Sequence, residues 1–254
     1  MFEAIVLGII QGLTEFIPVS STAHLILVPW LFGWQGDVNS LSFDIALHGG
    51  TLLALLVYFA RDIYDMFFRR PGVLFLLIVA TVPAAVVGVL FEDIVATTLR
   101  SPLVISASLV IFGLYMLLSE KTRSSRVFRE IKLMDAIMIG MAQAVALIPG
   151  VSRSGITIST GLLRGIKRED AARFSFLMSV PVIGGAVLLE GLKILKDPAM
   201  IDLKLTTVGF ASSAVSGFLT ISFLLWFFRR FSLRSFVYYR IILAVIIFMI
   251  WLKF

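Results

Sequence analysis

The chain has 254 residues, of which 59% are hydrophobic and only 15% are charged, and its mean hydropathy is +1.01. These values exclude an ordinary soluble domain and are typical of an integral membrane protein. The net charge of +6 does not indicate nucleic-acid binding, because the basic residues lie in short segments between apolar runs. The absence of cysteine excludes disulfide and thiolate chemistry.

The first apolar stretch, residues 4–24, is interrupted by polar, ionisable and helix-breaking residues. We predict a helix over residues 4–17 that ends before Pro18, because the residue preceding a proline is disfavoured in helical geometry. A carboxylate at membrane depth costs about 2.5 to 3.5 kcal/mol, so Glu15 should face protein, a metal ion or water. A packing role for Glu15, hydrogen-bonded to Gln143 or to serines, is the alternative. One face of this helix carries Gly8, Gln11, Gly12 and Glu15.

After Pro18 the residues Ser20, Ser21 and Thr22 predict the start of a second helix, with one serine as its N-cap. His24 follows one turn later. A serine within a turn of a histidine and near an acid provides the parts of an activated hydroxyl. His48, at the start of the next apolar run, has no such neighbours in the sequence, so its role stays open.

Six apolar runs are long enough to span a bilayer core of roughly 30 Å. The N-terminal segment has no basic flank, which argues against a cleaved signal peptide. The predicted spans are residues 43–60, 73–91, 101–118, 174–192, 205–228 and 235–252.

A second interrupted segment lies at residues 136–155 and leads into the turn Pro149 to Thr157. Glycines let backbone approach a ligand, a helix N-terminus presents free N–H groups, and arginine adds planar donors that suit phosphate. We therefore predict an anion cradle around Arg153. The alternative is a structural ion pair between Arg153 and Glu15. The two interpretations are compatible if the ion pair is present in the empty site and is replaced when phosphate binds.

The two interrupted segments are copies of one another. Residues of the first recur 132 positions later in the second: Ala4, Ile5, Gly8 and Gln11 return as Ala136, Ile137, Gly140 and Gln143, and Val19-Ser20 returns as Val151-Ser152. Three spans follow each segment, and three is odd, so the halves should have opposite orientations. We predict an all-α integral membrane protein with an inverted repeat. Each half is a re-entrant helical hairpin plus three transmembrane helices, in one domain of residues 1–254 with repeats of about 1–119 and 135–254.

The distribution of charge predicts an orientation. If both hairpins enter and leave on one face, 15 of the 22 Lys and Arg residues fall on one side of the membrane and only five, Arg100, Lys193, Lys196, Lys204 and Lys253, on the other. The positive-inside rule makes the rich side cytoplasmic. Both termini are then extracytoplasmic.

The strings from Gln11 to His24 and from Pro149 to Gly155 resemble the two signature motifs of the bacitracin-resistance (BacA) family of undecaprenyl-diphosphate phosphatases. The resemblance extends over nearly the whole chain. It implies hydrolysis of a prenyl diphosphate lipid to the monophosphate carrier that peptidoglycan synthesis reuses. It also implies a divalent cation, Mg²⁺ or Ca²⁺, and a site that opens to the outer side of the bacterial cytoplasmic (inner) membrane.

By this resemblance, Gln11 and Glu15 match the family's acidic motif, although position 11 is the Gln variant and only Glu15 is a carboxylate. A scheme that needs two acidic metal ligands is weakened. Glu15 would orient or deprotonate the attacking group or bind the metal, and His24 would act as acid or base. The resemblance assigns catalytic roles to Glu15, Ser21, His24 and Arg153, and substrate binding to Gln11, Ser20, Ser152, Ser154, Gly155 and Thr157.

The preferred chemistry makes Ser21 a nucleophile that forms a transient phosphoserine. Direct attack by water, with Ser21 only a ligand, stays open. A secondary transporter is the alternative from another class, because inverted repeats with broken helices are common among transporters. A phosphatase that also flips its lipid product is a third interpretation. The sequence leaves the oligomeric state open, a homodimer included, and gives no sign of a nucleic-acid partner.

Overall fold

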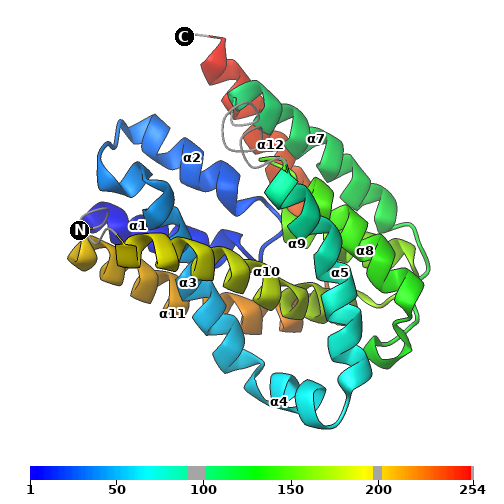
Figure 1. The fold of residues 1–254 in the computed structure, drawn as a ribbon. Helices are drawn as coiled ribbons and strands as arrows, with labels where there is room; N and C mark the ends of the chain where they lie inside the picture. The colour runs from blue at the N-terminus through cyan, green and yellow to red at the C-terminus, as the bar shows by residue number, and fades with distance from the viewer. Residues whose placement is uncertain (91–100, 197–201, 253–254) are drawn as a thin grey trace.

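The computed structural model describes residues 1–90, 101–196 and 202–252. This part of the chain is helical (Figure 1). It contains two 3-10 turns, η1 (Asp37–Asn39) and η3 (Phe128–Glu130). The helices are α1 (Phe2–Thr14), α2 (Ser21–Phe32), α3 (Leu41–Tyr58), α4 (Ala60–Phe68), α5 (Pro71–Leu90), α7 (Pro102–Ser119), α8 (Leu133–Val145), α9 (Arg153–Leu163), α10 (Arg168–Lys196), α11 (Leu203–Phe228) and α12 (Arg234–Trp251).

Six of these helices, α3, α5, α7, α10, α11 and α12, are long and apolar enough to cross a membrane, which confirms the six predicted spans. The largest difference in a boundary concerns α10, which starts at Arg168 rather than at residue 174. Its first two turns are charged and lie outside the apolar window from which the span was predicted. The predicted extracytoplasmic residues Arg100 and Lys253 lie outside the described residues.

Two pairs of shorter helices, α1–α2 and α8–α9, are re-entrant hairpins. The first hairpin begins and ends at one end of the molecule, where the rings of Phe2 and Trp34 lie 6.5 Å apart. In the second hairpin, Asp135 in the first turn of α8 accepts a hydrogen bond from Arg164, directly after α9. Each hairpin therefore returns to the face from which it entered.

Helix α1 is shorter than predicted. Regular helix ends at Thr14 instead of residue 17, and turns continue to Val19. Pro18 has no N–H with which to bond the carbonyl of Thr14, so the helical ladder loses the next hydrogen bond at that residue.

The second helix of each hairpin starts in the same unusual way. Ser20 caps α2 and Ser152 caps α9, and each side-chain oxygen accepts a hydrogen bond from the N–H three residues later. Their φ angles are 78° and 71°, and they are the two non-glycine residues with positive φ in the described ranges. They are 132 positions apart, so the repeat found in the sequence is preserved in the backbone conformation of the two hairpin tips.

The first helix of each hairpin packs against the opposite half of the chain. Gly8 of α1 lies so close to α11 that a Cβ there would approach the Gly209 carbonyl oxygen to 2.5 Å. Its equivalent, Gly140 of α8, has the same relation to the Ala80 carbonyl of α5, at 2.6 Å. The pairs α1 with α11, α5 with α8 and α7 with α12 therefore connect the two halves (Figure 1).

The segments rich in basic residues gather at one end of the molecule, opposite to the open end of the first hairpin (Figure 1). They are residues 61–70, 121–132, 164–173 and 229–234, and we call this end the basic end. This geometry agrees with the same-face arrangement expected from the charge count. Ion pairs join these segments to one another: Arg173 with Asp62, Arg168 with Glu120, and Arg229 with Glu169.

Replacing Asp135 with asparagine is expected to destabilise this end. Burial alone raises the pKa of the Asp135 carboxyl, but hydrogen bonds from Arg126, the Lys132 N–H and Arg164 outweigh it and hold the pKa at about 2. This stabilisation is fully present above the unfolded value of 3.8 and is lost as pH falls toward 2. We expect Asp135→Asn to cost about 3 kcal/mol at neutral pH, because it leaves two arginines without their carboxylate.

Thermal unfolding in detergent at several pH values measures this effect. The wild type should lose stability between about pH 4 and pH 2, and Asp135→Asn should lose much less over the same range. Equal unfolding temperatures for the two proteins at pH 7 would contradict the assignment.

Candidate active site

The two hairpin tips enclose a cavity of about 230 Å³ in the middle of the molecule. Both hairpins contribute polar side chains to it, and the spans α3, α5 and α10 contribute apolar ones. The lining residues include Glu15, Ser20, Ser21, His48, Gln143, Ser152 and Arg153, with Ile45, Ala84, Val182, Ile183 and Ala186 from the spans.

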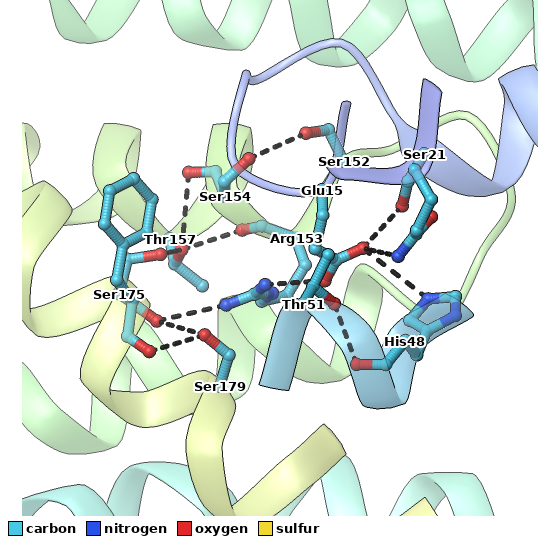
Figure 2. Close-up of polar contacts among 12 residues, drawn as sticks. Glu15, Ser21, His48, Thr51, Ser152, Arg153, Ser154, Thr157, Ser175 and Ser179 are labelled. Atoms are coloured by element: carbon cyan, nitrogen blue, oxygen red, sulfur yellow. Dashed lines mark hydrogen bonds and ion pairs between the residues drawn. The ribbon is translucent and has the colours of Figure 1, made fainter. Parts of the chain in front are cut away.

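The carboxylate of Glu15 is the centre of the polar contacts (Figure 2). Ser21 Oγ donates to Glu15 Oε2 at 2.8 Å, and Gln11 Nε2 donates to the same oxygen at 3.0 Å. Arg153 Nη2 donates to Oε1 at 2.8 Å across the boundary between the hairpins. The carboxylate therefore orients the Ser21 hydroxyl from one hairpin while it is held by a cation from the other.

Arg153 keeps donors available for a ligand. It uses one N–H on Glu15 and one on the carbonyl of Ser175, at 3.1 Å. A guanidinium has five N–H groups, so three remain. The ion pair that the sequence analysis gave as an alternative is present, and it leaves enough of the planar donor set to bind phosphate.

His48 lies beside Glu15, a position that nothing in its local sequence indicates. Its Nε2 is 3.5 Å from Glu15 Oε2. Its Nδ1 lies 2.8 Å from the carbonyl oxygen of Asp44. Because a carbonyl only accepts, Nδ1 carries the proton and Nε2 faces the carboxylate. Helix α3 brings His48 to the site, and no local motif around it could have shown this.

His24 is placed differently from the expectation. Its Nδ1–H donates to the carbonyl of Ser20 at 2.7 Å, and its Nε2 lies 2.7 Å from the hydroxyl of Tyr239. The ring is buried and is not among the residues that line the cavity. The structure does not bring His24 to Glu15 or to Ser21, so the role that the resemblance assigns to it stays a prediction without geometric support.

Of the other predicted residues, some line the cavity and the rest are buried behind the residues that line it. Ser20 and Ser152 line the cavity. Ser154 and Thr157 are buried, and Thr157 donates to the carbonyl of Arg153 at 2.7 Å. These two and Gly155 lie behind Arg153 and do not line the cavity. Gln11, fully buried, supports Glu15 from behind.

The two glutamines of the repeat, Gln11 and Gln143, share a feature that was not predicted. Gln143 lines the cavity, and its Oε1 is buried without a hydrogen-bond partner. The Oε1 of Gln11, its equivalent in the first half, is in the same condition. The signal was available, because both glutamines were part of the recognised repeat.

Fold and site together define a polytopic membrane protein whose polar cavity is built from two inverted re-entrant hairpins. The sequence model described as "Bacitracin resistance protein BacA" matches residues 4–246. The chain belongs to this family.

Curated relatives agree with this assignment over nearly their full length. A protein of Thermodesulfovibrio yellowstonii is 50% identical over 251 residues, which cover 99% of this chain and 97% of the relative. A protein of Moorella thermoacetica is 47% identical over 264 residues, 100% and 99% of the two chains. One from Desulforudis audaxviator is 48% identical over 258 residues, 98% and 97%. All three relatives are named undecaprenyl-diphosphatase.

Proposed function

We propose that this protein hydrolyses undecaprenyl diphosphate to undecaprenyl phosphate and inorganic phosphate. This activity recycles the lipid carrier for peptidoglycan synthesis and confers resistance to bacitracin. The observation that carries the proposal is the contact of the Ser21 hydroxyl with a carboxylate that is itself held by Arg153. Nucleophile, acid and phosphate-binding cation thus meet in one cavity.

In the first step, Ser21 Oγ attacks the terminal phosphorus in line with the bridging oxygen. The O–P bond forms as the bond to the bridging oxygen breaks, and undecaprenyl phosphate leaves. The serine proton passes to Glu15, the acceptor at 2.8 Å. Arg153 and the N-terminus of α9 hold the equatorial oxygens, where charge gathers in the transition state.

The proton on Glu15 first passes to the leaving undecaprenyl phosphate, so that the carboxylate is free again. In the second step, water attacks the phosphoserine and gives a proton to Glu15. The bond between phosphorus and the Ser21 oxygen breaks, this oxygen takes the proton back from Glu15, and inorganic phosphate leaves. Direct attack of water on the diphosphate is the alternative, in which Ser21 only orients the phosphate. Phosphoryl transfer depends mainly on positioning and charge, so the same cavity serves both routes.

The cavity has room for the diphosphate group of such a substrate but not for its whole isoprenoid chain. A volume of about 230 Å³ holds a diphosphate group and the first part of a prenyl chain. The apolar side of the wall comes from Ile45 of α3, Ala84 of α5 and Val182 of α10. We infer that the isoprenoid chain leaves the cavity past these helices and reaches the bilayer.

A divalent cation is part of the proposal. Mg²⁺ and Ca²⁺ prefer oxygen ligands, and Mg²⁺ is commonly bound by one or two carboxylates together with substrate phosphates. Glu15 and the unpartnered Oε1 of Gln143 fit this role. Among the described residues, no group of three or more histidine, aspartate or glutamate side chains is arranged to hold a metal ion by itself. The cation would neutralise charge on the diphosphate.

Phosphate release by the purified full-length protein tests the function. The substrates are C15 and C55 prenyl diphosphates, each with and without added Mg²⁺. We expect stoichiometric prenyl monophosphate and inorganic phosphate from both. No phosphate release from a folded protein with either lipid and Mg²⁺ present would overturn the proposal. The transporter alternative has no support from the three relatives, none of which is named as a transporter.

His48 and His24 are expected to have different roles in the reaction. We propose that His48 exchanges protons with Glu15, the base of both steps, because its Nε2 lies beside that carboxylate, and that His24 supports the Ser20 backbone. Both His48→Gln and His24→Gln should lower turnover. Only His48→Gln should remove a histidine ionisation from the pH–rate profile, because glutamine does not titrate. An unchanged profile in His48→Gln, or a lost ionisation in His24→Gln, would reverse the assignment.

For the orientation, we propose that the basic end is cytoplasmic in the bacterial inner membrane and that the cavity opens outward. A reporter fused after residue 126 should then read cytoplasmic, and one after residue 254 extracytoplasmic. The reason is that 15 basic residues belong to segments at the basic end. Fusions after both positions that read on the same side would contradict the inverted repeat.

A further inference from the structure

Arg240 is a buried charge that the mechanism above does not use. It lies in the span α12, and its exposed fraction is 0%. An arginine at membrane depth is costly and usually marks a functional position. Among the described residues, no carboxylate forms an ion pair with it; its partners are all carbonyl oxygens.

Four carbonyls surround the guanidinium. Two belong to α7: Nε donates to Leu109 at 3.2 Å, and Nη2 donates to Ser108 at 3.4 Å. The other two belong to the hairpin tips. Nη1 donates to the Pro18 carbonyl at 3.3 Å, and Nη2 donates to the Gly150 carbonyl at 2.8 Å. One side chain therefore connects both hairpins to the pair of spans α7 and α12.

The two tip carbonyls are equivalent in the repeat, since Pro18 and Gly150 are 132 positions apart. Each lies in a turn two residues before a capping serine, outside the regular helices. A buried carbonyl that is left without a donor costs roughly 1 to 3 kcal/mol. The planar fork of Arg240 can reach both at once, which a lysine ammonium cannot do as well.

The contact leads directly to the cavity. Gly150 makes two contacts: its carbonyl accepts a hydrogen bond from Arg240, and its N–H donates to Ser20 Oγ at 3.2 Å. Ser20 is the residue before Ser21 and the cap of the helix that carries it. Arg240 thus binds Gly150 of the second hairpin, and Gly150 in turn binds Ser20 of the first hairpin, next to the proposed nucleophile Ser21.

We propose that Arg240 is a positioning residue for phosphoryl transfer, which fixes the two hairpin tips at the separation at which Ser21 and Arg153 act on one phosphate. The inference rests on the proposed phosphatase activity. Misplacement of reacting groups by about 1 Å can cost about 100-fold in rate. The loss should therefore appear in kcat, since the phosphate-binding donors of Arg153 stay in place.

The test compares Arg240→Lys and Arg240→Met with the wild type in phosphate release from C15 prenyl diphosphate. We expect kcat to fall about 10-fold in the lysine variant, which keeps a donor, and about 100-fold in the methionine variant. KM should stay within about threefold. Asp135→Asn is the control, because it weakens the fold at the basic end without touching the cavity. Assays run below the unfolding temperature of every variant, as measured by thermal unfolding.

A double variant separates positioning from general destabilisation. If Arg240 acts through Gly150 and Ser20, then Arg240→Lys combined with Ser20→Ala should lose less activity than the product of the two single losses. A kcat in Arg240→Lys within about twofold of the wild type, a loss shared equally by Asp135→Asn, or strictly multiplicative losses would each overturn the inference. Absence of phosphate release by the wild type would instead overturn the proposed function itself.

Discussion

Ser21→Ala is expected to lower turnover by about three orders of magnitude or more while leaving lipid binding largely intact. The reason is the division of the site between two hairpins. Ser21 and Glu15 come from the first, whereas Arg153, which we propose to bind the phosphate, comes from the second. Removing the hydroxyl removes the nucleophile without removing the anion cradle.

Two measurements examine this expectation. Kinetics of phosphate release give kcat, and quenching during turnover with substrate labelled in its terminal phosphate should place label on the peptide that contains Ser21. Ser213→Ala is a matched control, because Ser213 is a fully buried serine that donates to the Leu47 carbonyl away from the cavity. It should keep wild-type turnover. Robust activity in Ser21→Ala would exclude the covalent route and leave Glu15 or His48 to activate water.

Arg153→Lys is expected to lower kcat about 100-fold, and Arg153→Ala about 1,000-fold. Lysine keeps the positive charge and can still pair with Glu15. It loses the planar donors that bind two phosphate oxygens together, and it cannot reach the Ser175 carbonyl at the same time. Turnover of both variants is measured with C15 prenyl diphosphate after their folding has been checked by thermal unfolding.

Near-wild-type hydrolysis in Arg153→Lys would contradict bidentate phosphate binding. Arg126→Lys supplies the control for an arginine outside the cavity. It lies at the basic end, paired with Asp135, and should change stability but not kcat. A similar loss of kcat in both lysine variants would indicate a general effect of the substitution.

Much of the architecture could be predicted because polar residues inside apolar sequence are costly and therefore informative. Glu15, Pro18 and the serines around them identified the hairpin tips, and the interval of 132 residues identified the repeat. The six spans followed from apolar length alone. The Glu15–Arg153 pair was among the stated alternatives because both residues lay on the copied segments.

The parts that could not be predicted depend on contacts between distant residues. His48 and Arg240 lie in ordinary-looking spans, and their importance comes from helices that pack beside the hairpins. His24 looked like the partner of Ser21 because it is near in sequence. The positive φ of Ser20 and the geometry of the α2 cap direct it instead toward Tyr239. The spacing of residues along the sequence describes a single helix, whereas the cavity is lined by residues of seven helices, α1, α2, α3, α5, α8, α9 and α10.

The packing of each hairpin against the opposite half of the chain has a consequence for biosynthesis. Helix α1 is synthesised well before α11, the helix against which Gly8 packs, because the two contact residues are about 200 positions apart. Glu15 likewise has no ion-pair partner until Arg153 has been synthesised. During translation the first hairpin therefore has neither its packing partner nor its counter-charge, and it cannot settle in its final position until most of the chain is inserted. The second hairpin finds α5 already made and folds without this delay. The first hairpin is thus made before the second but reaches its native contacts after it.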